Sequence, residues 1–306
     1  MAACACSTSF LVPLPAACGR LCAAVWLLLF ASLFSTGCAT RRDAACEPNV
    51  PLGGRLSAPG TVVFVLSTAP EQVLANGKRR STGFFLGEFY EPYRAVSDAG
   101  YRVVFATVDG QPPVIDPESL DPAYWEAHPA WLAEAKAFVA EDPRLHAPMR
   151  LRELAARVDA FQGIVVPGGQ GVMIDLLDNQ DLHAALAEFG AADRAVGLAC
   201  HAPAVLSRMP EASNPFMGRR VTSVSGFEEF YIERVVMKGR ATDRGIGRQL
   251  SRGGFVHKTG APGKPHAMRD GTLATSQNPF SGDAFNVELL AALELARAGG
   301  GGACSR

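Results

Sequence analysis

The sequence carries almost no net charge and has none of the residue spacings that usually hold a metal ion. Its 306 residues sum to a formal net charge of −1. Lysine and arginine are scattered along the chain, so no basic stripe is present to attract nucleic acid. CxxC motifs and histidine pairs at i,i+4 are both absent. We therefore expect no nucleic-acid partner and no metal site.

The glycine-rich run at 168–171 lacks the features of a nucleotide-binding loop. It has neither the lysine and the serine or threonine of a P-loop nor the glycine spacing of a Rossmann turn. We therefore expect a protein that works without a bound cofactor.

Cysteine is nearly absent from the body of the chain, where Cys200 stands alone. A single cysteine has no partner within the body, which excludes a disulfide scaffold there. The other cysteines lie near the two ends of the chain: Cys4, Cys6, Cys18, Cys22, Cys38, Cys46 and Cys304. Cys46 and Cys304 could pair in an oxidising compartment, and the sequence leaves this open.

The apolar run at 21–34 is shorter than the roughly 20 residues that span a bilayer, and it has the length of a signal-peptide core. Small residues precede Cys38, as in bacterial lipoprotein signals, although Ser35 replaces the usual leucine. We expect a signal peptide at 1–37 and a lipid on Cys38. The protein would then be exported and anchored to a membrane, facing the periplasm. A plain cleaved signal, an uncleaved anchor helix and a downstream start codon are the alternatives.

The rest of the chain divides into a tether, one folded domain and a short tail. Residues 38–60 are rich in arginine, proline, glycine and alanine without an apolar period, which is typical of a linker. We expect a single domain over 61–298, because this length suits one hydrophobic core. The glycine-rich end at 299–306 is expected to be disordered. The sequence leaves the oligomeric state open, a homodimer included.

Apolar runs typical of buried strands alternate with helical patterns through the domain. The runs lie at 61–66, 101–108, 163–169 and 195–199, and the helical patterns at 85–99, 122–140, 181–189, 202–209 and 283–298. This alternation predicts an α/β fold with a doubly wound, mostly parallel sheet. Ligands of such sheets bind beyond the carboxyl ends of the strands.

Cys200 comes directly after the strand at 195–199 and just before a helical pattern, which predicts a nucleophile elbow. Pro203 fits the first turn of that helix, where a missing N–H costs nothing. The N–H groups of a helix start and the imidazole of His201 both favour a thiolate. We therefore expect Cys200 to be a nucleophile with an unusually acidic thiol.

Four segments resemble motifs of the ThiJ/PfpI superfamily, and in particular its glyoxalase III and Hsp31-type chaperone branch. They lie at 82–92, 167–171, 200–204 and 221–229, and the likeness spans roughly 61–295. The segment at 270–279 is similar to the closing strand of the family and its Asn-Pro turn. The resemblance implies a flavodoxin-like fold, related to that of the class I glutamine amidotransferases. Gln170 and Ala202 stand where the branch usually has histidine and glycine.

The resemblance implies a role for each candidate residue. Cys200 matches the nucleophile and Glu88 matches the glutamate that contacts it. Gly168, Gly169 and His201 would bind the substrate oxyanion.

His201 also belongs to the predicted catalytic set, and an imidazole needs an acid to fix its tautomer. Glu229 matches that acid best, with Glu228 as the alternative. A carboxyl such as Glu88, buried near a thiolate, should hold its proton more tightly than in water.

These residues support more than one function. The first hypothesis is a glutathione-independent glyoxalase, an enzyme that converts methylglyoxal or a related 2-oxoaldehyde into a hydroxy acid through a hemithioacetal on Cys200. The second is a stress chaperone or redox-sensing binding protein without turnover. A cysteine amidase or peptidase of the same superfamily is a third, because a thiolate with an oxyanion site also supports acyl transfer.

Overall fold

The computed structural model describes residues 59–300. The predicted signal peptide, most of the tether, the lipidation site Cys38 and the candidate pair Cys46 and Cys304 lie outside these residues. Among the described residues, no helix is both long and apolar enough to cross a membrane.

A seven-stranded sheet forms the centre of the domain, with the strand order β10-β11-β7-β6-β1-β4-β5. Neighbouring strands are parallel except β10, which runs antiparallel to β11. The strands are β1 Thr61–Val65, β4 Arg102–Thr107, β5 Met149–Arg150, β6 Gly163–Val166, β7 Ala195–Ala199, β10 Ala267–Asp270 and β11 Leu273–Ser276. The predicted doubly wound, mostly parallel α/β fold is therefore confirmed.

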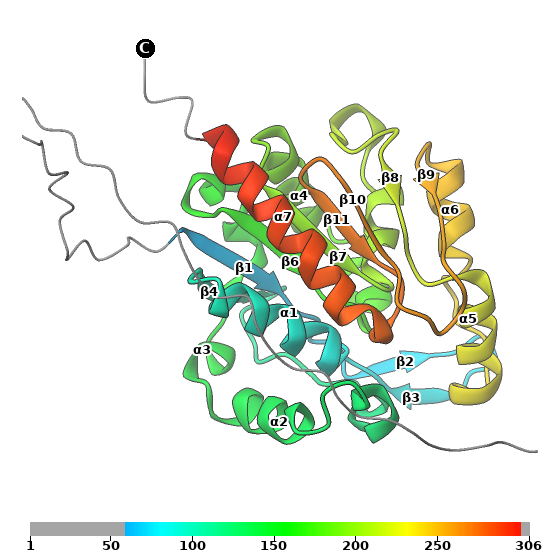
Figure 1. The fold of residues 1–306 in the computed structure, drawn as a ribbon. Helices are drawn as coiled ribbons and strands as arrows, with labels where there is room; N and C mark the ends of the chain where they lie inside the picture. Colours follow the sequence, from blue (N-terminus) through cyan, green and yellow to red (C-terminus); the bar gives the residue numbers. More distant parts are fainter. Residues whose placement is uncertain (1–58, 301–306) are drawn as a thin grey trace, which may run out of the picture. The chain divides into compact units, whose positions relative to one another are not determined.

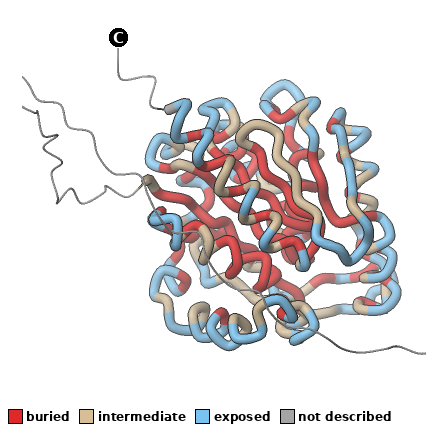
Figure 2. Tube along the Cα trace, in the orientation of Figure 1, coloured by how far each residue is buried: buried red, intermediate tan, exposed pale blue. Residues whose placement is uncertain are grey.

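Helices cover both faces of the sheet because alternate residues of each strand point to opposite sides. Val62 and Phe64 of β1 pack on one side, whereas Val63 and Val65 pack on the other. The first side is covered by α1 Leu86–Asp98, α2 Trp131–Glu141 and α7 Gly282–Gly300. The second is covered by α4 Gln180–Ala191, α6 Ile246–Arg252 and the 3-10 helix η6 Ala202–Ser207. Figure 2 shows that the buried residues follow the strands between these layers.

Shorter elements complete the domain. Two small strand pairs lie outside the main sheet: β2 Glu71–Val73 forms an antiparallel hairpin with β3 Arg79–Ser81, and β8 Arg220–Val221 pairs in parallel with β9 Val256–His257. The short α-helices are α3 Pro143–His146 and α5 Gly226–Tyr231. The remaining turns are the 3-10 helices η1 Pro117–Leu120, η2 Pro122–Trp125, η3 Leu151–Glu153, η4 Ala155–Ala160, η7 Glu211–Ser213 and η9 Pro279–Ser281, and the π-helices η5 Val172–Leu176 and η8 Ile232–Val236.

Three predicted helices have other bounds in the structure. The one at 122–140 is two elements, η2 and α2, because Pro129 disfavours helical backbone in the residue before it and lacks an N–H. The one at 202–209 is the tighter 3-10 helix η6. The last helix, α7, ends at Gly300, two residues inside the tail that the sequence predicts at 299–306.

Four neighbouring strands end at the same edge of the sheet. Val166 of β6 pairs with Leu198 of β7, so Gly168 comes level with Cys200. Ser276 of β11 pairs with Ala199, which places Asn278 beside the same point. The carboxyl ends of these parallel strands therefore bring segments distant in sequence to one place.

A second buried carboxyl, Glu91, lies under the start of α7. A Cβ atom added to Gly282 would coincide with Glu91 Oε2, so the carboxyl occupies the space that a side chain would need there. Burial, and then the charge of Asp283, raise the pKa of Glu91 to about 8. Glu91 is therefore a neutral acid at pH 7.

We predict that Glu91→Gln reduces the pH dependence of stability. The folded-state pKa of about 8 lies above the ordinary value of 4.5. The folded protein therefore binds the extra proton, and its free energy of unfolding falls as the pH rises from about 4.5 to about 8. Glutamine stays neutral, so urea unfolding at pH 5 and pH 8 should show a smaller fall in the variant than in the wild type. Equal falls would contradict this account.

Candidate active site

Cys200 lies at the turn between β7 and η6, as the elbow pattern predicts. Its φ of 54° is in the left-handed region, which is strained for a residue with a side chain. The backbone on both sides is fixed by hydrogen bonds: Cys200 N–H donates to Ser276 O at 2.9 Å and Val224 N–H donates to Cys200 O at 3.0 Å. This geometry directs the thiol into the cavity beyond the strand ends.

The prediction of an acidic thiol is wrong for the resting site. Cys200 is 4% exposed, and burial raises the pKa of its thiol well above the usual value. The negative charges of Glu88 and Glu228 raise the pKa further, against the lowering effect of the backbone N–H of His201. The helix that follows is six residues of 3-10 helix, so its dipole is short. Activation of the thiol therefore depends on a neighbouring proton acceptor.

Glu88 is that neighbour. It lies in the first turn of α1, is 6% exposed, and neither of its carboxyl oxygens has an ordinary hydrogen-bond partner among the described residues. Burial raises the pKa of Glu88 to about 8, and the charge of Glu91 adds to this; interactions with the Cys200 side chain and the Gly168 backbone act in the opposite direction. At neutral pH Glu88 is therefore a protonated acid beside the thiol.

Gly168 separates the two groups and leaves no room for a side chain. A Cβ atom at this position would lie 2.3 Å from Glu88 Oε2 and 2.7 Å from Cys200 Cβ. The structure therefore assigns Gly168 a spacing role. Neither Gly168 nor Glu88 is among the residues that line the cavity in front of Cys200, and the contact of Gly168 with a substrate oxyanion stays a prediction.

Gly169 does line the cavity, where its φ of 107° requires glycine. Its N–H has no hydrogen-bond partner among the described residues. The Gly169 N–H is therefore free to donate to an oxygen of a bound molecule, and the oxyanion contact that the family resemblance implies stays a prediction.

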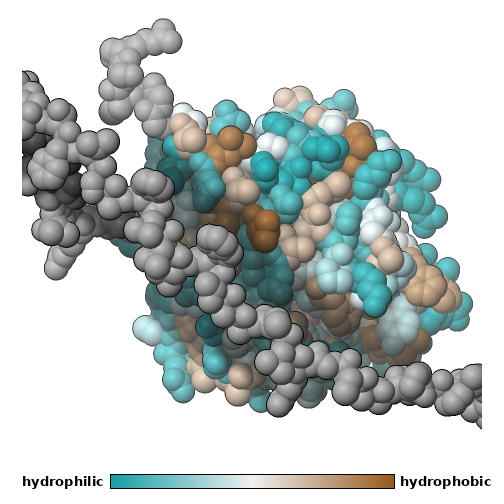
Figure 3. All heavy atoms as spheres, viewed as in Figure 1, coloured by the Kyte–Doolittle hydropathy of each residue, from teal (hydrophilic) through white to brown (hydrophobic). Residues whose placement is uncertain are grey.

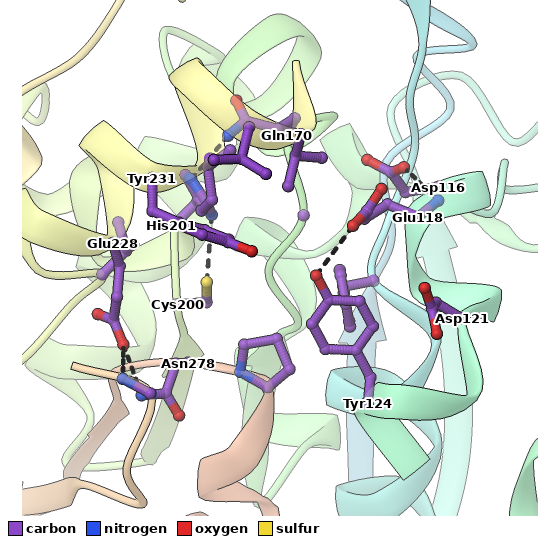
Figure 4. A pocket seen from close by; sticks show the side chains of 18 of the residues that line it. Asp116, Glu118, Asp121, Tyr124, Gln170, Cys200, His201, Glu228, Tyr231 and Asn278 are labelled. Carbon is purple, nitrogen blue, oxygen red and sulfur yellow. Dashed lines mark hydrogen bonds between the residues drawn. The ribbon is translucent and has the colours of Figure 1, made fainter. Parts of the chain in front are cut away.

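His201 contacts the thiol directly. Its Nδ1 lies 3.2 Å from Cys200 Sγ and its Nε2 lies 2.9 Å from Gln170 Nε2 (Figure 4). Burial lowers the pKa of His201 to about 4; the positive charge of Arg80 acts in the same direction, and the charge of Glu228 opposes both. His201 is therefore a neutral imidazole whose partner is an amide in place of the expected carboxylate.

Glu229 lies away from His201 and the prediction that it partners His201 is wrong. Its Oε1 accepts the N–H groups of Gly245 at 2.8 Å and Ile246 at 3.4 Å, which fixes the start of α6. Glu229 therefore stabilises the packing of α6 against α5.

Glu228, the alternative acid, lines the cavity. One of its oxygens completes a capping box with Ser225, and the other accepts Gly263 N–H and Asn278 Nδ2–H at 2.8 Å each. Burial acts to raise the pKa of Glu228, but these hydrogen bonds outweigh it and lower the pKa. Glu228 is therefore an anion that holds Asn278 at the cavity floor (Figure 4).

The cavity in front of Cys200 has a volume of about 770 Å³. One wall is polar and includes Arg80, Asp116, Glu118 and Asp121; the other is apolar and includes Phe227, Tyr231, Ile232 and Val235. Phe227 is 64% exposed and Tyr231 is 51% exposed, so this apolar wall continues to the surface. Figure 3 shows apolar atoms at the surface around α5 and along α7.

Sequence analysis did not identify several residues of the site. Gln72 and Arg80 come from the hairpin of β2 and β3, whose three-residue strands carry no apolar alternation. Asn278 could have been predicted as a site residue, because it belongs to the Asn-Pro turn in the segment at 270–279 that resembles the family. Among the described residues, no group of three or more histidine, cysteine, aspartate or glutamate side chains could hold a metal ion.

Comparison with known proteins gives consistent matches over the domain. A model of the DJ-1/PfpI family matches residues 81–292. Protein/nucleic acid deglycase 1 of Escherichia coli is 28% identical over 226 residues, which make up 72% of this chain and 75% of the relative.

Solved structures share the fold. Glyoxalase III from Candida albicans has a TM-score of 0.62 at 20% identity and covers 77% of this chain and 98% of its own. A rapid encystment protein from Francisella tularensis has a TM-score of 0.63 at 21% identity and covers 76% of this chain and 99% of its own. At these identities the likeness is one of fold.

We predict that Gly168→Ala disables the site while the protein still folds. The added methyl group would overlap Glu88 Oε2 and Cys200 Cβ and force the carboxyl and the thiol apart. Alkylation of Cys200 by iodoacetamide should therefore follow a different pH profile in this variant. The matched control is Gly226→Ala, whose added Cβ meets no atom within 4 Å. An unchanged profile in Gly168→Ala would contradict the spacing role.

The two neighbouring glutamates should respond differently to substitution. Glu228→Gln puts an N–H₂ group where donors from Ser225, Gly263 and Asn278 converge, so the cavity floor should rearrange and catalytic turnover should fall about tenfold or more. Glu229→Gln keeps an acceptor for Gly245 N–H, so we expect a loss of about 1 kcal/mol in stability and little change in turnover. Steady-state kinetics and urea unfolding of both variants test this, and the reverse pattern would restore Glu229 to the site.

Proposed function

This chain belongs to the DJ-1/PfpI family, and from that premise we propose that it converts methylglyoxal or a related 2-oxoaldehyde into a 2-hydroxy acid without a cofactor. The observation that carries the proposal is the buried pair of Glu88 and Cys200, held together across Gly168. An acid beside a nucleophile suits a reaction that needs both addition to a carbonyl group and movement of a proton between two carbons.

The first step is addition of the thiolate to the aldehyde. The reactive form of the pair holds one proton: Glu88, with the lower pKa, ionises first, and the thiol proton then passes to its carboxylate as Cys200 becomes the thiolate. Cys200 Sγ forms a bond to the aldehyde carbon, and the carbonyl oxygen takes the proton from Glu88. The products are a hemithioacetal and an ionised Glu88, which can now act as a base.

The second step moves hydrogen from one carbon to the next. Glu88 removes the proton from the former aldehyde carbon, and the N–H of Gly169, which lines the cavity, stabilises the negative charge that develops on the neighbouring oxygen. Glu88 then returns the proton to the second carbon, and the hydroxyl proton of the first carbon passes to the oxygen on the second, which leaves a 2-hydroxy thioester on Cys200. Water hydrolyses the thioester and releases the 2-hydroxy acid, so the reaction needs no external oxidant or reductant.

The cavity also fits substrates larger than methylglyoxal. A volume of about 770 Å³ is in the range of sites that hold much larger molecules. The Escherichia coli relative is named a protein and nucleic acid deglycase, and the same addition and proton transfer could act on an aldehyde adduct carried by such a molecule. The larger cavity favours testing bulky 2-oxoaldehydes beside methylglyoxal.

The direct test is to incubate the purified protein with methylglyoxal in the absence of glutathione and to measure lactate. We expect lactate to form, and Cys200→Ser to abolish its formation because a hydroxyl is not ionised at neutral pH. If the wild type forms no lactate, or Cys200→Ser forms as much, the proposal fails and a chaperone or binding role is favoured.

The pH profile tests the role of Glu88 in the same assay. At low pH both Glu88 and the thiol are protonated, so kcat/KM should rise with pH and level off above about 8, the pKa of Glu88. Glu88→Gln should lower the rate about 100-fold or more, since positioned general bases contribute at least that much. Glu134→Gln, outside the cavity, is the matched control. A wild-type profile that is flat between pH 6 and 9 would exclude the shared proton.

A further inference from the structure

A buried glutamine on the hairpin reaches the site through a second glutamine. Gln72 of β2 is 1% exposed, and its Nε2–H donates to Gln170 Oε1 at 3.3 Å. Gln170 Nε2 in turn lies 2.9 Å from His201 Nε2, and His201 Nδ1 lies 3.2 Å from Cys200 Sγ. The four side chains form one continuous path from the hairpin to the thiol.

The direction of the hydrogen bonds follows from the chemistry of the amides. An amide nitrogen can only donate, so His201 Nε2 must accept from Gln170 and carry no proton of its own. Turning Gln170 alone would set its N–H₂ group against the N–H₂ group of Gln72. In the present arrangement Gln72 Oε1 is buried without a hydrogen-bond partner. Turning both amides would put the N–H₂ group of Gln72 at that position, and unpaired buried donors are rarer than unpaired acceptors.

We propose that Gln72 and Gln170 form an amide relay that holds His201 as its Nδ1–H tautomer, so that His201 donates a hydrogen bond to Cys200 Sγ. Gln170 is thus a positioning residue, which acts on the thiol through His201. A neutral imidazole has one N–H, and the relay places it on the nitrogen that faces the sulfur.

The relay decides which group takes the thiol proton. His201 Nδ1 already carries a proton and cannot accept another, which leaves the ionised form of Glu88 to receive it. This consequence rests on the proposed function, in which Glu88 moves protons. The tautomer of His201 is independent of that function. A cysteine hydrolase needs its imidazole to accept the thiol proton and return it to a leaving amine. The relay therefore favours proton shuttling by Glu88 over amide hydrolysis.

The charged groups around His201 keep this state over a wide pH range. Arg80 faces it from β3 and Glu228 from α5, with Cys200 at the turn after β7 and Glu88 on α1 beyond the thiol. Because burial and Arg80 lower the pKa of His201 to about 4, the imidazole stays neutral above about pH 5.

The wild-type protein itself provides the first test. Nitrogen-15 NMR distinguishes a protonated from an unprotonated imidazole nitrogen, and the signals of His201 can be assigned by their loss in His201→Gln. Between pH 6 and 8 we expect a protonated Nδ1 and an unprotonated Nε2. A protonated Nε2, or an imidazole with both nitrogens protonated, would overturn the relay.

The second test replaces Gln170 by a carboxylate of nearly the same shape. In Gln170→Glu the carboxylate should accept a hydrogen bond from a protonated His201 Nε2. It should thereby stabilise the imidazolium form of His201 beside the sulfur. Iodoacetamide should then label Cys200 about tenfold or more faster at pH 6 than in the wild type, since one unit of thiol pKa changes the thiolate fraction tenfold. The matched control, Gln111→Glu, adds the same charge at an exposed position and should react as the wild type does. Equal labelling in Gln170→Glu and the wild type would contradict the proposal.

A third variant, Gln72→Met, removes the outer amide and keeps its bulk. Gln170 is then free to turn, so both tautomers of His201 should appear in the NMR spectrum; a single Nδ1–H tautomer would show that Gln72 has no part in the relay.

None of these measurements uses a substrate. If the protein fails to form lactate but shows the Nδ1–H tautomer, the proposed function fails and the relay stands. If it forms lactate but shows the Nε2–H tautomer, the relay fails and the proposed function stands.

Discussion

The site depends on the burial of one carboxyl group against one thiol. Glu88 and Cys200 come from α1 and the end of β7, and they meet where Gly168 leaves no room for a side chain. Two acidic groups in a dry space cannot both ionise at low cost, so burial couples their protons. The raised pKa values of both groups follow from this constraint. The strained backbone of Cys200 fixes the direction of its thiol at the end of β7.

The rest of the domain serves to hold this pair in place. The parallel strands end at one edge, which sets Gly168 and Asn278 level with Cys200. Glu228 fixes Asn278 through a charge-assisted hydrogen bond, and Glu229 ties α5 to α6. Adjacent glutamates thus have separate tasks because successive helical residues point about 100° apart. His201 contributes a neutral hydrogen-bond donor, and its tautomer is set by Gln170, which follows β6, and by Gln72 of the hairpin outside the main sheet.

Much of the fold could be predicted from the sequence, because fully buried strands such as Thr61–Val65 are continuous apolar runs and the elbow at Cys200 interrupts a clear pattern. Glu88 and Gly169 could be placed because each lies in a motif. The sequence left Glu228 and Glu229 both open, since one step along a helix changes which residue faces the cavity, and the amide partner of His201 depends on contacts that the sequence does not show. The raised pKa of Cys200 was missed because burial outweighs a short helix dipole, and burial depends on residues far apart in sequence. Gln72 was missed because a three-residue strand has no period to recognise.

The central claim is that Glu88 is a protonated acid beside Cys200 at neutral pH, and infrared spectroscopy tests it most directly. The difference spectrum between the wild type and Glu88→Gln isolates the carboxyl group of Glu88. We expect the carbonyl band of a protonated carboxyl at pH 7, replaced by carboxylate bands as the pH passes through about 8. Carboxylate bands for Glu88 already present at pH 6 would contradict the account.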